Sequence, residues 1–206
     1  MTKNLIFLGP PGSGKGTQIE RLREKHQLAV VSSGDIVRNL AKENQDYREK
    51  MEKGELISDE ILFHEISKRL ETERTETGLI FDGFPRNVAQ ATKLDQILSE
   101  HNRSLSGVVY IELDEEEVVK RLSIRKVCGQ CGQPLFDTEI CPKCGGSPII
   151  RRDDNEETIR NRMRVFLDKT LPLVKYYQEK NKLIEIDGKQ TIEAVGNDIS
   201  EALANA

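Results

Sequence analysis

Five short runs of apolar residues recur along the chain, each bounded by polar or turn-forming residues. They cover residues 5–8, 28–31, 79–81, 108–111 and 183–186. Runs of this length without polar alternation are typical of strands that are buried on both faces of a parallel sheet. Residues with helical spacing lie between the runs, so the pattern predicts an α/β fold with three layers and a five-stranded parallel sheet.

The connection across residues 33–74 is too long for one crossover helix. Leu62, Ile66 and Leu70 recur at four-residue spacing, which predicts that the last of several short helices buries one face there. Near the end of the chain, Pro172 is typical of a helix start, and a strand and a final helix are expected after it. The chain therefore carries a helical insertion on the first half of its sheet.

Composition and charge narrow the classes of function. The 206 residues include 31 basic and 35 acidic side chains, a net charge of −4, without a basic block. This distribution disfavours a nucleic-acid partner. Apolar runs of four or five residues are too short to span a membrane, and the first residues lack a signal-peptide pattern, so we expect a cytoplasmic protein without a membrane partner.

A glycine-rich sequence, GPPGSGKGT at 9–17, follows the first apolar run and precedes a helical pattern. Glycines let successive backbone N–H groups face one anion, the helix start adds a positive dipole end, and Lys15 adds a cation. The hydroxyl comes at Thr17, one residue later than in the common pattern, because Gly16 follows the lysine. A tight turn between a strand and a helix is the alternative, but the context favours a phosphate-binding loop.

Two more polar groups follow predicted strands. Ser32-Ser33-Gly34-Asp35 comes after the second strand, with Arg38 about one helical turn later, and could bind an anion or cap a helix. Asp82 comes at the end of the third strand, where α/β folds place ligands. Its carboxylate can hold Mg²⁺ through water, and capping the next helix is the alternative.

Four arginines lie around the second half of the chain. Arg121 and Arg125 are four residues apart on a predicted helix and hence on one face. Arg151 and Arg162 flank the acidic segment 153–157. Any one of them is explained by exposed ion pairing, but the group suggests an enzyme whose substrates carry two phosphate chains.

Cysteines occur only between residues 128 and 144, in two Cys-x-x-Cys pairs, Cys128/Cys131 and Cys141/Cys144. Each pair with its following glycine predicts a tight knuckle, and two knuckles complete a tetrahedral site for a structural Zn²⁺. Disulfides, a redox pair or bound iron are the alternatives. Residues 126–150, hereafter the cysteine segment, have few apolar side chains, so we expect metal binding to stabilise them.

Taken together, these motifs resemble those of the adenylate kinases of the bacterial type, which have a metal-binding lid. The stretches that carry the resemblance are GPPGSGKGT (9–17), SSGD (32–35) followed by Arg38, GELISDE (54–60), DGFPRNVAQ (82–90) and DDNEETIRNR (153–162). The resemblance implies a phosphate-loop core (1–31, 62–124 and 163–206), a helical insertion that binds the nucleoside monophosphate (32–61) and a small zinc-ribbon-like lid (125–162).

The resemblance also implies roles for individual residues. It assigns the ATP phosphates to Gly12, Ser13, Gly14, Lys15, Gly16 and Thr17, with Arg121 and Arg125 near the nucleotide and the backbone of Gln190 near its adenine. It assigns AMP to Ser33, Arg38, Glu55, Leu56, Ile57, Gly83, Phe84, Pro85, Arg86 and Gln90, with Arg151 and Arg162 closing over both phosphate chains.

The implied reaction is the reversible transfer of the γ-phosphoryl group of MgATP to AMP, giving two ADP, by a monomeric enzyme. The residues expected to act in catalysis are Lys15, Asp82, Arg86, Arg121, Arg125, Arg151 and Arg162. A CMP or UMP kinase is the nearest rival, and Gln90 favours AMP because its amide offers a donor and an acceptor to adenine. A zinc ribbon that binds nucleic acid is a second rival, although residues 128–148 contain one lysine and no arginine.

Overall fold

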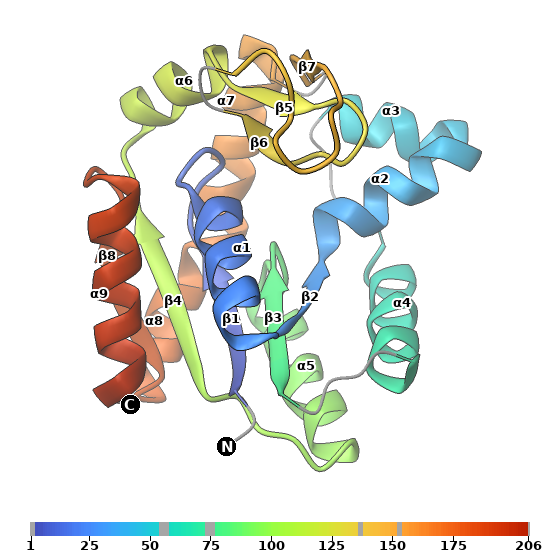
Figure 1. Cartoon of the computed structure of the whole chain (residues 1–206). Coiled ribbons are helices and arrows are strands. Elements are labelled where there is room, and N and C mark those ends of the chain that lie inside the picture. Colours follow the sequence, from blue (N-terminus) through green and yellow to red (C-terminus); the bar gives the residue numbers. More distant parts are fainter. Residues whose placement is uncertain (1–2, 54–57, 73–76, 136–137, 152–153, 206) are drawn as a thin grey trace.

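Five parallel strands form the central sheet, in the spatial order β2-β3-β1-β4-β8 (Figure 1). The computed structural model describes residues 3–53, 58–72, 77–135, 138–151 and 154–205. The strands are β1 (Lys3–Leu8), β2 (Ala29–Ser32), β3 (Gly78–Asp82), β4 (Gly107–Glu112) and β8 (Leu183–Asp187). Each of the five apolar runs therefore overlaps a strand, which confirms the predicted parallel sheet, but the edge strands β2 and β8 are only partly buried.

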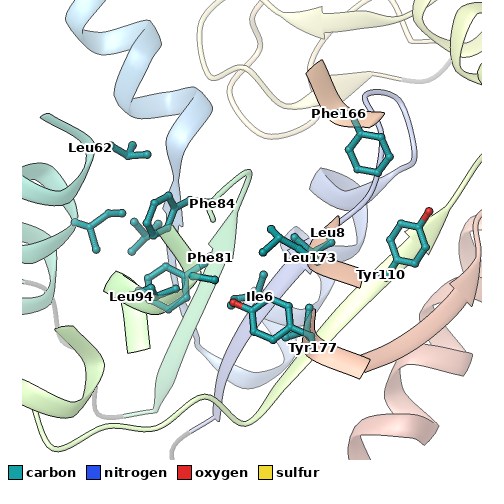
Figure 2. Close-up of a cluster of buried hydrophobic side chains, with 14 of the residues drawn as sticks. Ile6, Leu8, Leu62, Phe81, Phe84, Leu94, Tyr110, Phe166, Leu173 and Tyr177 are labelled. Atoms are coloured by element: carbon teal, nitrogen blue, oxygen red, sulfur yellow. The ribbon is translucent and has the colours of Figure 1, made fainter. Parts of the chain in front are cut away.

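Helices cover both faces of the sheet because alternate residues of each strand point to opposite sides. On one face Leu5 and Phe7 pack with residues of α1 (Lys15–His26) and α9 (Ile192–Asn205). On the other face Ile6 and Leu8 pack with residues of α5 (Val88–Glu100) and α8 (Pro172–Glu179), and Figure 2 shows the side chains gathered there. The three predicted layers are present.

The helical insertion contains α2 (Ser33–Glu43), α3 (Gln45–Lys53) and α4 (Asp59–Thr72). Leu62, Ile66 and Leu70 of α4 are buried, as their spacing predicted. α2 begins directly at the end of β2 because the Ser32 hydroxyl accepts a hydrogen bond from the backbone N–H of Asp35. This junction places the start of α2 at the carboxyl edge of the sheet.

The cysteine segment forms a second, antiparallel sheet in the order β6-β5-β7. Its strands are β5 (Lys126–Cys128), β6 (Pro134–Leu135) and β7 (Pro148–Ile149), and it lies between α6 (Glu115–Ser123) and α7 (Glu156–Val165). Its cluster of buried apolar residues consists of Cys128, Leu135 and Cys141 among the described residues. So small a cluster agrees with the expectation that another source of stability is needed.

The expectation that Arg121 and Arg125 share one helix face is wrong. α6 ends at Ser123, the exposed Ile124 follows it, and the chain then extends into β5. The helix ends before Arg125 because the backbone becomes extended in β5, which begins at Lys126. The Arg125 guanidinium binds Asp154 instead of lying beside Arg121. Arg125 therefore belongs to the border of the cysteine segment.

A π-helical turn, η1 (Phe166–Thr170), joins α7 to α8. Pro172 lies at the first turn of α8, as predicted, but α8 continues the path of α7 through η1. The Thr170 hydroxyl donates to the carbonyl oxygen of Arg86 at 3.1 Å, so the turn contacts the loop after β3. None of the helices in the described ranges is long and apolar enough to cross a membrane.

Candidate active site and metal centre

The glycine-rich loop after β1 has the geometry of an anion cradle. Gly14, in a left-handed conformation at φ 92°, is the N-cap of α1, and no side chain in the described part of the chain caps that helix start. The Lys15 ammonium donates to the carbonyl oxygens of Gly9 and Pro10 at 2.7 and 2.9 Å and to the Ser13 hydroxyl at 3.2 Å. The lysine thus curls over the loop whose N–H groups an anion would approach.

The electrostatic surroundings of Lys15 show which distant residues gather here. Burial lowers the pKa of Lys15 to about 8. The negative charge of Asp82 opposes this shift, whereas the positive charges of Arg162, Arg86 and Arg125 add to it. Three cations from separate parts of the chain therefore act on one ammonium group: they come from the loop after β3, the border of the cysteine segment and α7. An anionic phosphate bound here would relieve their repulsion.

Asp82 ends β3, between β1 and β2, in register with Phe7 and Ser32. The Ser32 hydroxyl lies 3.4 Å from its carboxylate. Asp82 does not cap the next helix, because the Asn87 side chain does so by accepting the backbone N–H of Gln90 at 2.8 Å. The alternative role of Asp82 is thereby excluded, and its half-buried carboxylate lies at the edge where the loop of Lys15 begins.

Ser33 and the loop after β3 form one hydrogen-bonded group. The Ser33 hydroxyl donates to the carbonyl oxygen of Gly83 at 2.6 Å, and the Arg86 guanidinium donates to the same oxygen at 2.8 Å and to Ser33 at 3.4 Å. Burial lowers the pKa of Arg86, and the positive charge of Arg38, itself paired with Asp35 at 2.6 Å, lowers it further. Four residues predicted to bind AMP are therefore neighbours.

The other residues assigned to AMP fall into three groups. Phe84 is fully buried, with its ring edge-on to that of Phe63 at 5.6 Å, and the buried Pro85 follows it, so both side chains contribute to packing. The amide of Gln90 is held by hydrogen bonds from its own loop and to α4. Glu55, Leu56 and Ile57 lie outside the described residues.

Asp154 organises two of the predicted arginines. Its carboxylate accepts two hydrogen bonds from Arg125, at 2.7 and 2.6 Å, and lies 3.4 Å from the guanidinium of Arg162. The Asp154 side chain is 0% exposed. The sequence assigned this residue no role, because nothing local distinguishes it from the other acidic residues between Arg151 and Arg162. Arg151 lies half-buried at the other end of that segment.

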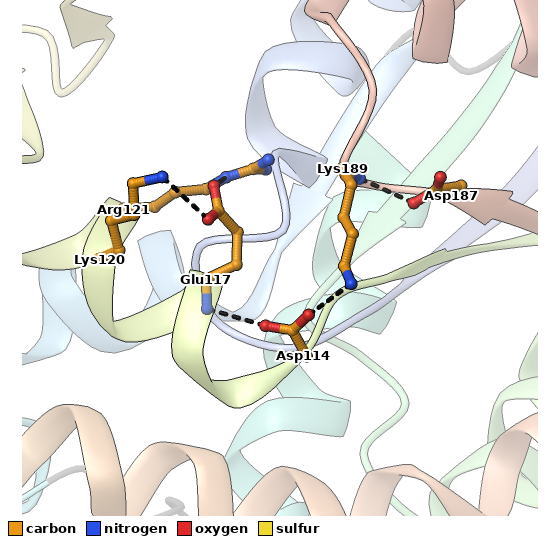
Figure 3. Close-up of polar contacts among 6 residues, drawn as sticks. All are labelled: Asp114, Glu117, Lys120, Arg121, Asp187 and Lys189. Carbon is orange, nitrogen blue, oxygen red and sulfur yellow. Dashed lines mark hydrogen bonds and ion pairs between the residues drawn. The ribbon is translucent and has the colours of Figure 1, made fainter.

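Figure 3 shows the polar contacts of Arg121 and of the loop after β8. Arg121 is bound by Glu117 of its own helix at 2.8 Å, so this contact within α6 orients it. Lys189 pairs with Asp114, the N-cap of α6, at 2.6 Å. Gln190 follows as an exposed residue whose amide donates to Asp198 of α9 at 2.8 Å. The loop that contains Gln190 is thereby tied to the start of α6.

The four cysteines converge, with all Sγ atoms within 4.8 Å of one another. Cys128 and Cys144 are 3.4 Å apart and Cys131 and Cys141 are 3.6 Å apart, whereas sulfurs around a tetrahedral zinc lie about 3.8 Å apart. All four are free thiols, so the disulfide alternative does not hold in this structure. The backbone N–H of Cys131 donates to Cys128 and lowers its pKa, whereas the hydrogen bond to Cys128 raises the pKa of Cys144, so the two thiols of this pair differ in how readily they form a thiolate. The donor set and spacing fit a closed four-sulfur metal site.

Comparison with known families covers nearly the whole chain. The sequence profile of the family described as "Adenylate kinase" matches residues 7–182. The chain belongs to the adenylate kinase family. An adenylate kinase of Archaeoglobus fulgidus is 42% identical, and the match covers 97% of each chain. The adenylate kinase of Thermotoga maritima is 41% identical, over 98% of this chain and 96% of its own length. That of Geobacillus sp. (strain WCH70) is 40% identical, over 97% of this chain and 98% of its own length.

Membership of the adenylate kinase family confirms the reaction that the sequence implied. The protein is a nucleoside monophosphate kinase that transfers a phosphoryl group reversibly between ATP and AMP, giving ADP. The roles of individual residues in that reaction are inferred from the contacts described above.

Proposed function

We propose that Lys15, Arg86, Arg125 and Arg162 bind the phosphate chains of MgATP and AMP and neutralise the charge of the transferring γ-phosphoryl group. The observation that supports this proposal is that three arginines from separate parts of the chain, Arg86, Arg125 and Arg162, all act electrostatically on the Lys15 ammonium, which itself folds over the phosphate loop. Phosphoryl transfer requires positioning and charge stabilisation and needs no side-chain nucleophile. The N–H groups of residues 12–17 complete the ATP side, with Arg121 nearby and the Gln190 backbone at the adenine.

Asp82 would hold Mg²⁺ through its water shell. Its carboxylate stands at the end of β3 beside the loop of Lys15, and Ser32 is the hydroxyl in contact with it. Mg²⁺ held in this way would supply positive charge that neutralises the γ-phosphoryl group during transfer. Asp82 also opposes the mutual repulsion of the cations while the site holds no nucleotide.

The division of the chain into a core, an AMP-binding insertion (32–61) and a lid (125–162) is part of the same proposal. Contacts between the last two support it, because the Thr158 hydroxyl donates to the carbonyl oxygen of Glu52 at 2.8 Å and the Asn161 amide donates to that of Lys53 at 2.6 Å. Lys143 of the cysteine segment pairs with Glu20 of α1 at 3.0 Å. These contacts join the two insertions to each other and the cysteine segment to α1, an arrangement that would exclude water from the reacting phosphates.

The cysteine cluster is proposed to hold one structural Zn²⁺ through four thiolates. A closed four-sulfur shell has no open position for substrate, so the ion would stabilise the fold of the lid without taking part in the chemistry. Four free thiols are typical of a reducing compartment, which supports a cytoplasmic location. We also propose that the protein acts as a monomer, as its resemblance to the adenylate kinases implied.

The acceptor preference is tested by assaying AMP, CMP, UMP and GMP with MgATP under the same conditions. AMP should be phosphorylated fastest, because Gln90 presents an amide beside the phosphate-binding Arg86. A faster reaction with CMP or UMP would overturn the assignment of Gln90 to adenine.

A further inference from the structure

Asp59 makes a contact that none of the assigned roles uses. It is the first residue of α4, and its carboxylate accepts a hydrogen bond of 2.5 Å from the amide nitrogen of Gln90 on α5. The amide oxygen of Gln90 in turn accepts the backbone N–H of Arg86 at 2.6 Å. Gln90 is only 2% exposed, so both ends of its amide are fixed inside the protein between the helical insertion and the loop after β3.

We propose that Asp59 is a positioning residue that fixes the polarity of the Gln90 amide and thereby selects the base of the acceptor nucleotide. The inference rests on the proposed function, which assigns Gln90 to adenine. A carboxylate can only accept hydrogen bonds and a backbone N–H can only donate them. Rotating the Gln90 amide by 180° would place oxygen against the carboxylate of Asp59 and nitrogen against the N–H of Arg86, which are two repulsive contacts.

The fixed amide retains one N–H and one lone pair for a ligand. Adenine offers a matching pair of groups, the amino donor at position 6 and the acceptor at N1. Hypoxanthine and guanine reverse this pair, with an acceptor at position 6 and a donor at N1. An amide that is free to rotate would accept either pattern, so the two restraints on Gln90 make the site reject the reversed pattern.

A purely structural role of Asp59 must be separated from this one. Asp59 lies in the first turn of α4, where any negative charge is favourable because of the helix dipole. Glu60 lies in the same turn with an exposed side chain, so E60Q is the matched control for loss of charge. D59N is the test variant, because an asparagine amide can still pair with Gln90 but can do so in either polarity.

The experiment measures kcat/KM for AMP and for inosine monophosphate, with MgATP saturating, in the intact protein and in E60Q, D59N, Q90L and the double variant D59N/Q90L. We expect D59N to lower the preference for AMP by about tenfold, the size of one hydrogen bond to a charged group, and E60Q to leave it unchanged. If D59N merely loosened the helix, kcat/KM would fall equally for AMP and for inosine monophosphate. In Q90L the preference should fall by a similar factor, and adding D59N should change it no further.

The possible failures are distinct. If Q90L keeps the preference of the intact protein, Gln90 does not contact the base, and both that part of the proposed function and this inference are wrong. If Q90L loses the preference and D59N keeps it, the adenine contact stands and the role of Asp59 is refuted. Additive effects of D59N and Q90L would also refute it, because Asp59 would then act on the base by another route.

Discussion

Replacing Asp154 by asparagine should loosen the cysteine segment more than any exposed charge change nearby. Asp154 is 0% exposed and joins Arg125, at the start of the segment, to the chain just before α7. D154N preserves the shape of the side chain but removes the charge that faces two guanidinium groups, those of Arg125 and Arg162.

The expected magnitude follows from the burial of this pair. Breaking a buried ion pair from one side costs about 3–5 kcal/mol, because the remaining charge stays desolvated without a partner. The border of the cysteine segment carries this cost, so the free energy of opening that segment should fall by about 3 kcal/mol. Its amide hydrogens should then exchange about 10²-fold faster, since 1.4 kcal/mol corresponds to a factor of ten.

The assay is native-state hydrogen exchange, with peptides from residues 126–151 compared with peptides from β1 and β4. The matched control is E156Q, because the Glu156 side chain is 71% exposed and pairs with Arg160 in solvent, where such pairs contribute little. Equal exchange rates in D154N and E156Q would refute the conclusion that Asp154 holds the border of the segment together.

Three further predictions concern the protonation of Lys15 and the metal site. The pKa of Lys15 is about 8 in the free protein, so kcat/KM for MgATP should fall as the pH rises above 8. In contrast, kcat should stay constant to higher pH, because bound phosphate favours the charged ammonium. A kcat/KM that does not change from pH 7 to 9.5 would contradict this prediction. The same lowered pKa means that this group destabilises the fold below pH 8 and progressively less up to its ordinary value of 10.5, as thermal unfolding at several pH values would show. Replacing Cys141 and Cys144 by serine should remove the metal and make residues 126–150 sensitive to protease while phosphoryl transfer persists; an unchanged metal content or unchanged resistance to protease would defeat the zinc assignment.

The central strands β1, β3 and β4 were predictable because they are buried on both faces, so uninterrupted apolar runs such as 5–8 and 108–111 mark them directly. The order of the strands was not, since pairing of β1 with β3 and β4 joins segments far apart in sequence. The prediction from helical spacing that Arg121 and Arg125 share one face was also wrong. The backbone becomes extended in β5 directly after α6, and Arg125 makes a tertiary contact with Asp154.

The candidate site shows the same division. The phosphate loop and the cysteine knuckles are local motifs whose spacing carries their chemistry, so both could be read from the chain. Asp154 and Asp59 could not, because each acts through a partner that folding brings to it from 29 or 31 residues away. A single carboxylate in an acidic stretch has no local feature that distinguishes it from its exposed neighbours.

The most direct test of the account is the turnover of K15M with MgATP and AMP. If the cations around Lys15 stabilise the transferring phosphoryl group, this variant should lose turnover by a factor on the order of 10³ while its circular dichroism spectrum and melting remain those of a folded protein. Near-normal turnover in a folded K15M protein would contradict the central claim that charge neutralisation at this loop drives the reaction.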